Sequence, residues 1–307
     1  MKVLVIIITY NGKHWVDHCL GSLTKSTLTS DVLIIDNRST DGTPEYIEKN
    51  FPEFELNRSD ANLGFGKANN VGLQKAIDED YDYVFLLNQD AWIEPDTIKI
   101  LVDIHQQHPE YGIISPMHLN KEKTSLDTKF SHFVSRSENK KLMSDLLLPN
   151  GHLRDVYTLD FVNAAAWLIP RECLKTVGGF DPLFPHYGED NDFINRAIYY
   201  GFKIGFTPNT SIVHDREGYL KQPDMHRSLA KQYTDRLRLL KNIHLSFGQT
   251  LFSVLKEEIY YAMSALLKLD LSLFFIKVRL IRRIISQRRA IQKSRKYCMN
   301  TQTAYLK

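Results

Sequence analysis

The 307-residue sequence predicts an α/β fold, a mostly parallel sheet flanked by helices, with a basic helical extension at its C-terminal end. Two observations predict this architecture. The first is that short segments that are apolar along their whole length alternate with helical segments, which is typical of strands buried on both faces. The second is a shift in charge: residues 221–307 hold 18 Lys+Arg and 5 Asp+Glu, whereas residues 1–220 hold 21 and 31. We therefore expect an acidic body that ends near residue 220 and a basic tail.

Four strand-then-helix units are expected in the first half of the chain. The strands are VLVIIIT (3–9), VLIID (32–36), a short segment at 54–57 and YVFLLN (83–88). The helices that follow them lie at about 13–25, from Pro44, at about 66–78 and from Pro95 to about 107. Residues 117–160 lose this rhythm and predict an irregular insertion or hairpin. Regular pattern returns at DFVNAAAWLIP and at FKIGFTPNTSIVHD.

The cysteines and the apolar runs indicate the compartment. Cys19, Cys173 and Cys298 lie far apart without a CxxC spacing, so they predict neither a disulfide framework nor a zinc cage. A reducing, cytoplasmic compartment is therefore expected. The N-terminal apolar run spans about seven residues without a following cleavage site, which favours an opening strand over a signal peptide. No run reaches the roughly 18–20 apolar residues of a transmembrane helix.

Polar residues stand where three of the expected strands end, and they are Thr9-Tyr10-Asn11, Asp36-Asn37 and Asn88-Gln89-Asp90. In open parallel sheets, ligands bind beyond the carboxyl ends of the strands, so these groups predict one ligand crevice. Asp36 could accept a hydrogen bond from a base or a ribose hydroxyl, while capping and turn chemistry alone explains residues 41–43. The run ending at Asp90 fits either turn chemistry or a metal site that lacks one carboxylate.

Three further motifs carry candidate chemistry. The stretch NLGFGKANNVGL (62–73) does not follow the first strand, which excludes a dinucleotide fingerprint, but its Gly-rich helix start and Lys67 could receive phosphate. In PHYGEDNDFINRA (185–197), Glu189, Asp190 and Asp192 could stabilise a helix N-terminus. Their crowding would also raise the pKa of a carboxyl, which suits a general base. His214 ends another strand and could be a metal ligand or a structural histidine.

Seven motifs in order carry a family resemblance: IIITYNG, IIDNRSTDGT, NLGFGKANNVGL, FLLNQDAW, GGFDPLF, GEDNDFINRA and IVHD. Over about residues 1–215 the chain resembles inverting glycosyltransferases of family 2, with a GT-A fold. It is most similar to the rhamnosyltransferase-like subgroup found in bacterial surface-polysaccharide synthesis, such as that of capsule or O-antigen. The resemblance implies a catalytic domain over 1–220, with a nucleotide-sugar half at about 1–115 and an acceptor half at about 116–220.

The resemblance also implies roles for single residues. Nucleotide-sugar contacts would come from Thr9, Tyr10, Asn11, Asp36, Asn37, Ser39, Asn62, Gly64, Lys67, Asn70, Asn88, Gln89 and Asp90. Asp90 and His214 would hold a divalent cation, Mn²⁺ or Mg²⁺, because the family's D-x-D motif reads Asn88-Gln89-Asp90 here. Asp190 would be the general base, and Glu189 would orient the acceptor or the base. Trp167, Gly179 and Phe180 would border the acceptor pocket.

The implied reaction moves a sugar from a nucleotide-diphosphate donor, of the dTDP-rhamnose or UDP-hexose type, to a hydroxyl of a glycan or a lipid-linked saccharide. Two other functions stay open. A catalytically inactive GT-A scaffold is suggested by Asn88 in place of an acid. A nucleotidylyltransferase would need a Gly-rich basic loop directly after the first strand, and TYNGKHW does not supply one.

The segment LSLFFIKVRLIRRIISQRRAIQKSRK (271–296) carries nine Lys/Arg and no acid. Its apolar residues recur at three- and four-residue steps, as in Phe274, Phe275, Val278, Ile281 and Ile285. This pattern is typical of an amphipathic helix on an anionic membrane surface, which predicts a peripheral position at the inner face of the cell membrane. The alternative is a helix packed on the body with its basic face solvated. We see no nucleic-acid recognition module and expect no nucleic-acid partner.

Overall fold

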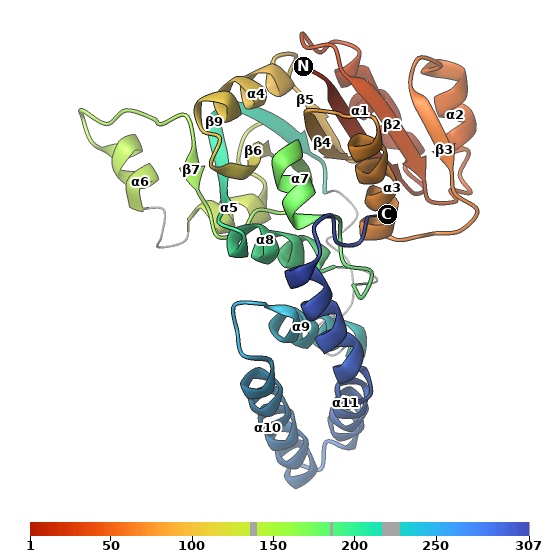
Figure 1. The fold of residues 1–307 in the computed structure, drawn as a ribbon, viewed down its shortest axis with the longest axis vertical. Coiled ribbons are helices and arrows are strands. Elements are labelled where there is room, and N and C mark those ends of the chain that lie inside the picture. The colour runs from red at the N-terminus through yellow and green to blue at the C-terminus, as the bar shows by residue number, and fades with distance from the viewer. Residues whose placement is uncertain (136–139, 185–186, 217–227, 307) are drawn as a thin grey trace.

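The computed structural model describes residues 1–135, 140–184, 187–216 and 228–306, and it has an α/β body from which a helical arm protrudes (Figure 1). The described strands form one sheet in the order β3-β2-β1-β4-β8-β6-β9-β5, with β7 paired to β9. Their bounds are β1 Val3–Thr9, β2 Asp31–Asp36, β3 Glu55–Arg58, β4 Tyr83–Asn88, β5 Ala91–Ile93, β6 Tyr111–Leu119, β7 Tyr157–Thr158, β8 Ala166–Pro170 and β9 Lys203–His214. This architecture confirms the expected fold class.

Helices cover the sheet and form the extension. Those of the body are η1 Lys13–Trp15, α1 Val16–Leu23, α2 Thr43–Asn50, α3 Phe65–Asp78, α4 Thr97–Gln107, α5 Thr128–Val134, α6 Lys140–Leu147, α7 Arg171–Val177 and α8 Glu189–Tyr199. Those of the extension are α9 Leu229–Lys241, α10 Phe247–Leu267 and α11 Leu271–Asn300. The expected irregular insertion at 117–160 holds α5, α6 and β7, and α6 lies on an arm away from the sheet. The expected boundary near residue 220 lies outside the described residues.

Strand β1 lies between β2 and β4, and its successive side chains enter two different apolar layers. Leu4 and Ile6 belong to one buried cluster, and Val5 and Ile7 belong to the other. Helix α3 approaches β1 so closely that a Cβ on its Gly72 would lie 2.6 Å from the Ile6 side chain. Strand β1 pairs in parallel with both β2 and β4, so the carboxyl ends of all three strands meet at one edge.

The second half of the sheet is mixed. Strand β8 runs antiparallel to β4 and β6, and β5 runs antiparallel to β9. An apolar run shows that a strand is buried on both faces but does not show its direction. The sequence pattern therefore indicated β8 and β9 without their orientation, and it did not identify β5, β6 or β7.

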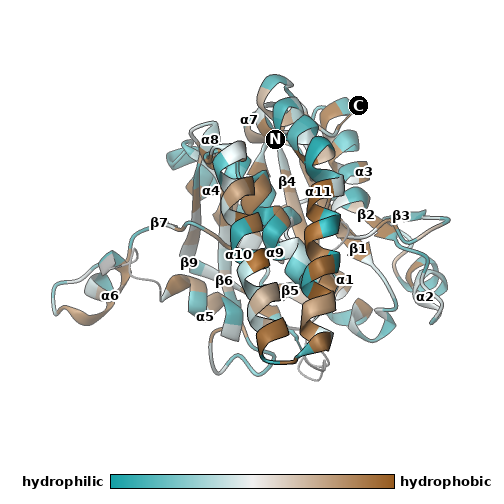
Figure 2. Ribbon diagram, turned by 90° about the horizontal axis from the view of Figure 1, so that it is seen from below, coloured by the Kyte–Doolittle hydropathy of each residue, from teal (hydrophilic) through white to brown (hydrophobic). Residues whose placement is uncertain are grey.

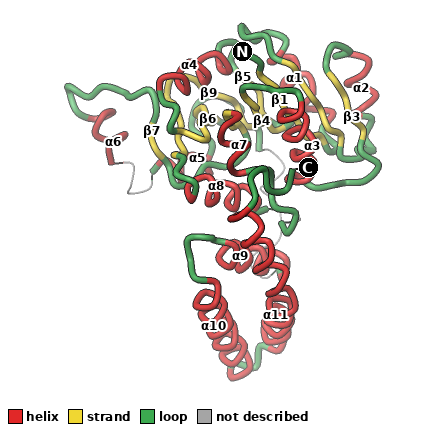
Figure 3. The backbone as a smooth tube through the Cα atoms, viewed as in Figure 1, coloured by secondary structure: helices red, strands yellow, loops and turns green. Residues whose placement is uncertain are grey.

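Within its described residues, the extension consists of helices and the loops that connect them (Figure 3). Helices α10 and α11 form a hairpin that points away from the sheet. Helix α11 buries Leu280, Ile284 and Ile291 in a cluster with residues of α9 and α10. The chain then returns to the body, where the backbone N–H of Gly179 donates to the carbonyl of Ala304 at 2.8 Å. Among the described helices, none is both long enough and apolar enough to cross a membrane.

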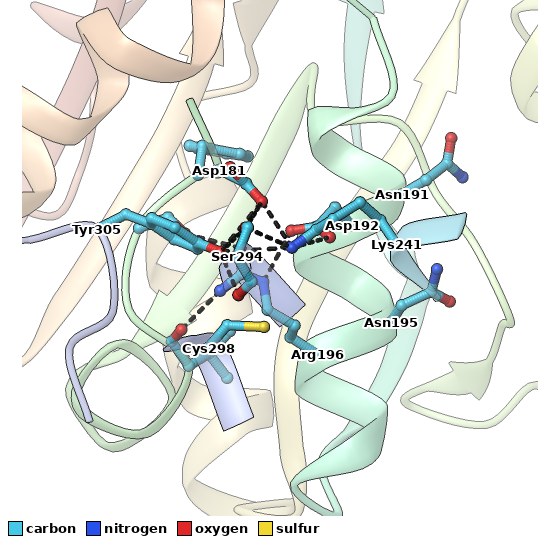
Figure 4. A network of polar contacts seen from close by, with 12 residues as sticks. Asp181, Asn191, Asp192, Asn195, Arg196, Lys241, Ser294, Cys298 and Tyr305 are labelled. Atoms are coloured by element: carbon cyan, nitrogen blue, oxygen red, sulfur yellow. Dashed lines mark hydrogen bonds and ion pairs between the residues drawn. The ribbon is translucent and has the colours of Figure 1, made fainter. Parts of the chain in front are cut away.

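A buried polar network joins the extension to the body (Figure 4). The Lys241 ammonium, at the end of α9, lies 2.6 Å from Asp181 and 3.7 Å from Asp192. Asp192 also pairs with Arg196 at 2.8 Å, one turn further along α8. The Ser294 hydroxyl of α11 donates to Asp181 at 2.5 Å. Of the three clustered acids noted in the sequence, Asp192 therefore belongs to this structural network.

Candidate active site

The buried Asp36 connects the ends of β1 and β2 through hydrogen bonds. One carboxylate oxygen accepts from the Thr9 hydroxyl at 2.8 Å and from the Ser39 hydroxyl at 2.6 Å. The other accepts from the Ser39 backbone N–H at 2.8 Å. Three hydrogen bonds within the chain thus fix this carboxylate at the edge where the strands end.

Asn11 and Gln89 stabilise the loops beside it. Asn11 adopts a φ of +48°, donates its backbone N–H to the Ser39 hydroxyl at 2.9 Å, and accepts from the Thr40 N–H at 2.8 Å. The Gln89 amide pairs with both backbone groups of Tyr10, at 2.8 and 3.2 Å. The side chains of Asn11 and Gln89 therefore hold the loops in place, while the Tyr10 ring is about half exposed.

The Gly-rich loop before α3 is held by asparagines. The Asn37 amide accepts from the Leu63 N–H at 3.2 Å and donates to the Gly64 carbonyl at 3.4 Å. Asn62 accepts from the Gly64 N–H at 2.9 Å, and Gly64 itself has a φ of +76°, which favours glycine. Lys67 follows on the first turn of α3 and is exposed. The loop thus places the N-terminus of α3 and the Lys67 side chain at the edge of the sheet.

Asn70 connects the two halves of the body. Its amide donates to the Phe180 carbonyl at 2.8 Å and accepts from the Phe180 N–H at 2.7 Å. A Cβ on Gly179 would lie 2.5 Å from the Asn70 amide oxygen, so the two segments meet without room for a side chain. The structure therefore places the Asn70 side chain in a bridge between the halves.

A cavity of about 240 Å³ opens beyond the ends of β4, β8 and β9. Its lining residues are Phe65, Asn88, Asp90, Lys129, Asn163, Ala164, Ala165, Tyr187, Glu189, Asp190, His214 and Arg216. It gathers Asn88 and Asp90 from the β4 end, Glu189 and Asp190 from the start of α8, and His214 from the end of β9. Five residues from three distant motifs of the sequence thus meet in one cavity.

Asp90 and His214 form the candidate cation site. Both are buried, and the His214 Nε2 lies 3.4 Å from an Asp90 carboxylate oxygen. Its Nδ1 has no hydrogen-bond partner. Within the described ranges, no group of three or more His, Cys, Asp or Glu could hold a metal ion. Mg²⁺ usually takes one or two carboxylates together with waters and substrate phosphates, so Asp90 and His214 would need further ligands from outside the chain to hold a cation.

The two acids at the start of α8 have perturbed pKa values. Burial, together with the neighbouring Asp190, raises the pKa of Glu189 from 4.5 to about 8. One Glu189 carboxylate oxygen is buried without a partner. Burial also raises the pKa of Asp190, against the lowering effect of the Asn191 N–H and of the charges on Arg238 and Lys129. Both carboxyls therefore hold protons more strongly than ordinary acids do.

Sequence reasoning missed two cations of this cavity, Lys129 of α5 and Arg216 just after β9. The Arg216 guanidinium pairs with Asp127 at 2.5 Å through Nε, while its Nη2 is buried without a partner. Burial lowers the pKa of Lys129, and the charge of Arg216 lowers it further. Arg216 could have been noticed two positions after His214, whereas Lys129 lies in the irregular insertion and carries no signal.

The three expected acceptor residues lie behind the cavity. Trp167 and Phe180 are fully buried, and their rings stack at 6.3 Å in the core with Phe193 nearby. Their side chains are not part of the cavity lining. Burial in the core keeps these two rings out of this cavity, and their expected place beside the acceptor stays a prediction. Gly179 lies against Asn70, as described above.

The mixed sheet, with acids, amides and a histidine collected where its strands end, has the GT-A fold of its solved neighbours. The chain belongs to glycosyl transferase family 2, whose family model matches residues 4–177. This assignment removes the nucleotidylyltransferase alternative.

Three similar proteins illustrate the relationship. The N-acetylglucosaminyl-diphospho-decaprenol L-rhamnosyltransferase of Mycobacterium tuberculosis is 24% identical over 241 residues, which cover 69% of this chain and 75% of that protein. TarS of Staphylococcus aureus, solved with UDP-GlcNAc, matches with a TM-score of 0.56 and 19% identity over 82% of this chain and 70% of that one. The mannosyltransferase PcManGT of Pyrobaculum calidifontis, solved with GDP-Man and Mn²⁺, has a TM-score of 0.55 and 17% identity over 95% and 79%. The two structural matches support the fold.

Proposed function

We propose that the chain transfers a sugar from a nucleotide-diphosphate donor to a hydroxyl of a glycan or lipid-linked acceptor, with inversion at the anomeric carbon. The observation that carries the proposal is the composition of the cavity. It combines a buried Asp–His pair, two cations and two carboxyls with raised pKa values. These are the groups needed to hold a diphosphate leaving group at one side and to remove a proton at the other.

The donor side is formed by Asp90, His214, Lys129 and Arg216. Asp90 and His214 would hold Mn²⁺ or Mg²⁺, and a bound cation stabilises the negative charge that develops on the departing diphosphate. The solved relative PcManGT, with GDP-Man and Mn²⁺, supports this cation. The unpartnered Nη2 of Arg216 offers a further donor to a phosphate oxygen. Asn88 removes one of the two D-x-D carboxylates that would hold the metal. Lys129 and Arg216 would neutralise part of the diphosphate charge that the metal would otherwise neutralise.

The acceptor side is formed by Asp190 and Glu189. Asp190 would take the proton from the acceptor hydroxyl as its oxygen attacks the anomeric carbon. The bond from that carbon to the diphosphate breaks as the new bond forms, so the configuration inverts. A Glu189 carboxyl with a pKa of about 8 keeps its proton at neutral pH. It can therefore donate a hydrogen bond that orients the acceptor or Asp190 without competing as the base.

The substrate class follows by similarity. The mycobacterial relative is named for an L-rhamnose transfer to a diphospho-decaprenol-linked sugar, and TarS is named for a polymer of ribitol phosphate. We propose a dTDP-rhamnose or UDP-hexose donor and an acceptor in polysaccharide synthesis. A lipid-linked acceptor would place the protein at the cytoplasmic face of the membrane.

The test compares Asp190→Asn with Glu189→Gln. The Asp190→Asn variant should lose transfer by at least about a hundredfold, as expected for loss of a general base, while donor binding measured by calorimetry persists. The Glu189→Gln variant keeps a hydrogen-bond donor and should retain most of its turnover. Near-normal transfer by Asp190→Asn would refute this base. Absence of transfer by the unaltered chain across a panel of nucleotide-sugars, with donor binding intact, would favour the scaffold alternative that Asn88 suggests.

A further inference from the structure

The end of the α10–α11 hairpin lies farthest from the sheet (Figure 1), and large apolar side chains are exposed there. We define the hairpin tip as Leu266, Leu267, Leu269, Leu271 and Phe275. Leu267 is 83% exposed and Leu269 is 82% exposed. Seen from below, hydrophobic residues lie along both helices near their connecting loop (Figure 2). Leucines this exposed, gathered at one end of a protruding element, indicate an interaction surface.

The flanks of the hairpin are basic. Residues 247–300 contain eleven Lys or Arg and three Asp or Glu. Two of the acids, Glu257 and Glu258, pair with Arg236 of α9, and Glu258 also pairs with Lys277. No described residue forms an ion pair with Lys268, Arg279, Arg282 or Arg289. The tip thus carries apolar side chains around Lys268, and Arg279, Arg282 and Arg289 follow along α11, where these cations can meet an anionic surface.

The two apolar faces of α11 have different roles. The buried face, with Leu280, Ile284 and Ile291, packs inside the extension. Apolar residues on the other side of the helix, such as Phe275 and Ile285, remain 56% and 40% exposed. Packing within the extension therefore accounts for one face and leaves the other, together with the tip, without a partner in the described chain.

We propose that the hairpin tip inserts into the interface of an anionic lipid bilayer, with the basic flanks of α10 and α11 against the headgroups. Apolar side chains surrounded by Lys and Arg match a membrane interface in both hydrophobicity and charge. The membrane contact is thus made by the tip and not by the whole 271–296 segment, and the tip lies away from the catalytic cavity. It does not depend on the transfer chemistry, because it concerns a different surface.

Co-sedimentation of the full chain with vesicles tests the proposal without donor or acceptor. Vesicles with equal parts phosphatidylglycerol and phosphatidylcholine should bind, and pure phosphatidylcholine vesicles should bind more weakly. The double variant Leu267→Glu with Leu269→Glu should lose about tenfold or more in partitioning, because two apolar side chains no longer leave water. Arg282→Gln should lose about fivefold at low salt and less at high salt. The matched control is Leu147→Glu on α6, where the leucine is 73% exposed.

A tryptophan at the tip gives a second measurement on a chain that keeps its apolar surface. In Leu267→Trp, emission should shift to shorter wavelength on anionic vesicles and be quenched by lipids brominated in their acyl chains. Three results would overturn the proposal: equal binding to both vesicle types, equal loss in Leu147→Glu, or no quenching. A dimer in sedimentation that Leu267→Glu dissociates would assign the tip to a second copy of the chain. Tight binding to duplex DNA that survives the leucine changes would assign the flanks to nucleic acid.

Discussion

Replacing Glu189 by glutamine should make the ligand-free fold more stable at alkaline pH. In the folded chain, burial and the neighbouring Asp190 raise the Glu189 pKa from 4.5 to about 8. Below pH 4.5 the carboxyl is protonated in both the folded and unfolded states and has no differential effect. Between pH 4.5 and about 8 the unfolded chain releases this proton while the folded chain keeps it. The free energy of unfolding therefore falls as pH rises through this window.

The slope is about 1.4 kcal/mol per pH unit, so the loss between pH 4.5 and 8 amounts to at most about 5 kcal/mol. The glutamine amide has the same shape and no charge, so Glu189→Gln should lie within about 1 kcal/mol of the unaltered chain at pH 5 and exceed it by several kcal/mol at pH 8.5. Urea unfolding followed by circular dichroism, in chelator and at both pH values, measures the difference. The exposed Glu53→Gln provides the control for loss of one charge. Parallel pH profiles for Glu189→Gln and the unaltered chain would refute the assigned pKa.

Four other substitutions give sharp expectations. Asp90→Ala should abolish the Mn²⁺-dependent part of donor binding, measured by calorimetry with and without chelator, whereas Asn88→Asp should keep it. Arg216→Ala should weaken donor binding to a similar degree with and without Mn²⁺, and a purely Mn²⁺-dependent loss would contradict a direct phosphate contact. Lys241→Met should destabilise the fold by about 3–5 kcal/mol, because it leaves two buried carboxylates without their shared cation. Urea unfolding against the exposed Lys293→Met would measure this, and equal midpoints would show that the network is dispensable.

The part of the site predicted from the sequence is the part fixed by strand topology. Side chains at the carboxyl ends of neighbouring parallel strands must meet at one edge, and Thr9, Asp36 and Asn88 do so through the pairing of β1 with β2 and β4. The meeting of Asp90 with His214 needed the antiparallel β5–β9 pair, in which Ala91 lies opposite His214. Burial on both faces does not reveal strand direction, so only the family resemblance, and not the pattern, brought these two residues together.

Side chains delivered by irregular segments could not be predicted. Lys129 reaches the cavity from α5, inside an insertion without hydrophobic period. The period of α11 likewise identified an apolar stripe through Phe275 and Ile285, although the helix packs through Leu280 and Ile284. A basic helix with two apolar stripes has two possible packing faces, and only the position of α9 and α10 decides between them.

Helix α8 connects the catalytic acids to the extension mechanically. Its first turn presents Glu189 and Asp190 to the cavity, and its next turns hold Asp192 and Arg196 in the buried network with Lys241. A rotation of α8 that moved the acids would therefore pull buried charges away from their partners, at a cost of several kcal/mol. The same network reaches α11 through Ser294. The extension is thus part of the support that fixes the orientation of the proposed base, and its removal should disturb the acids even though it contributes no residue to the cavity lining.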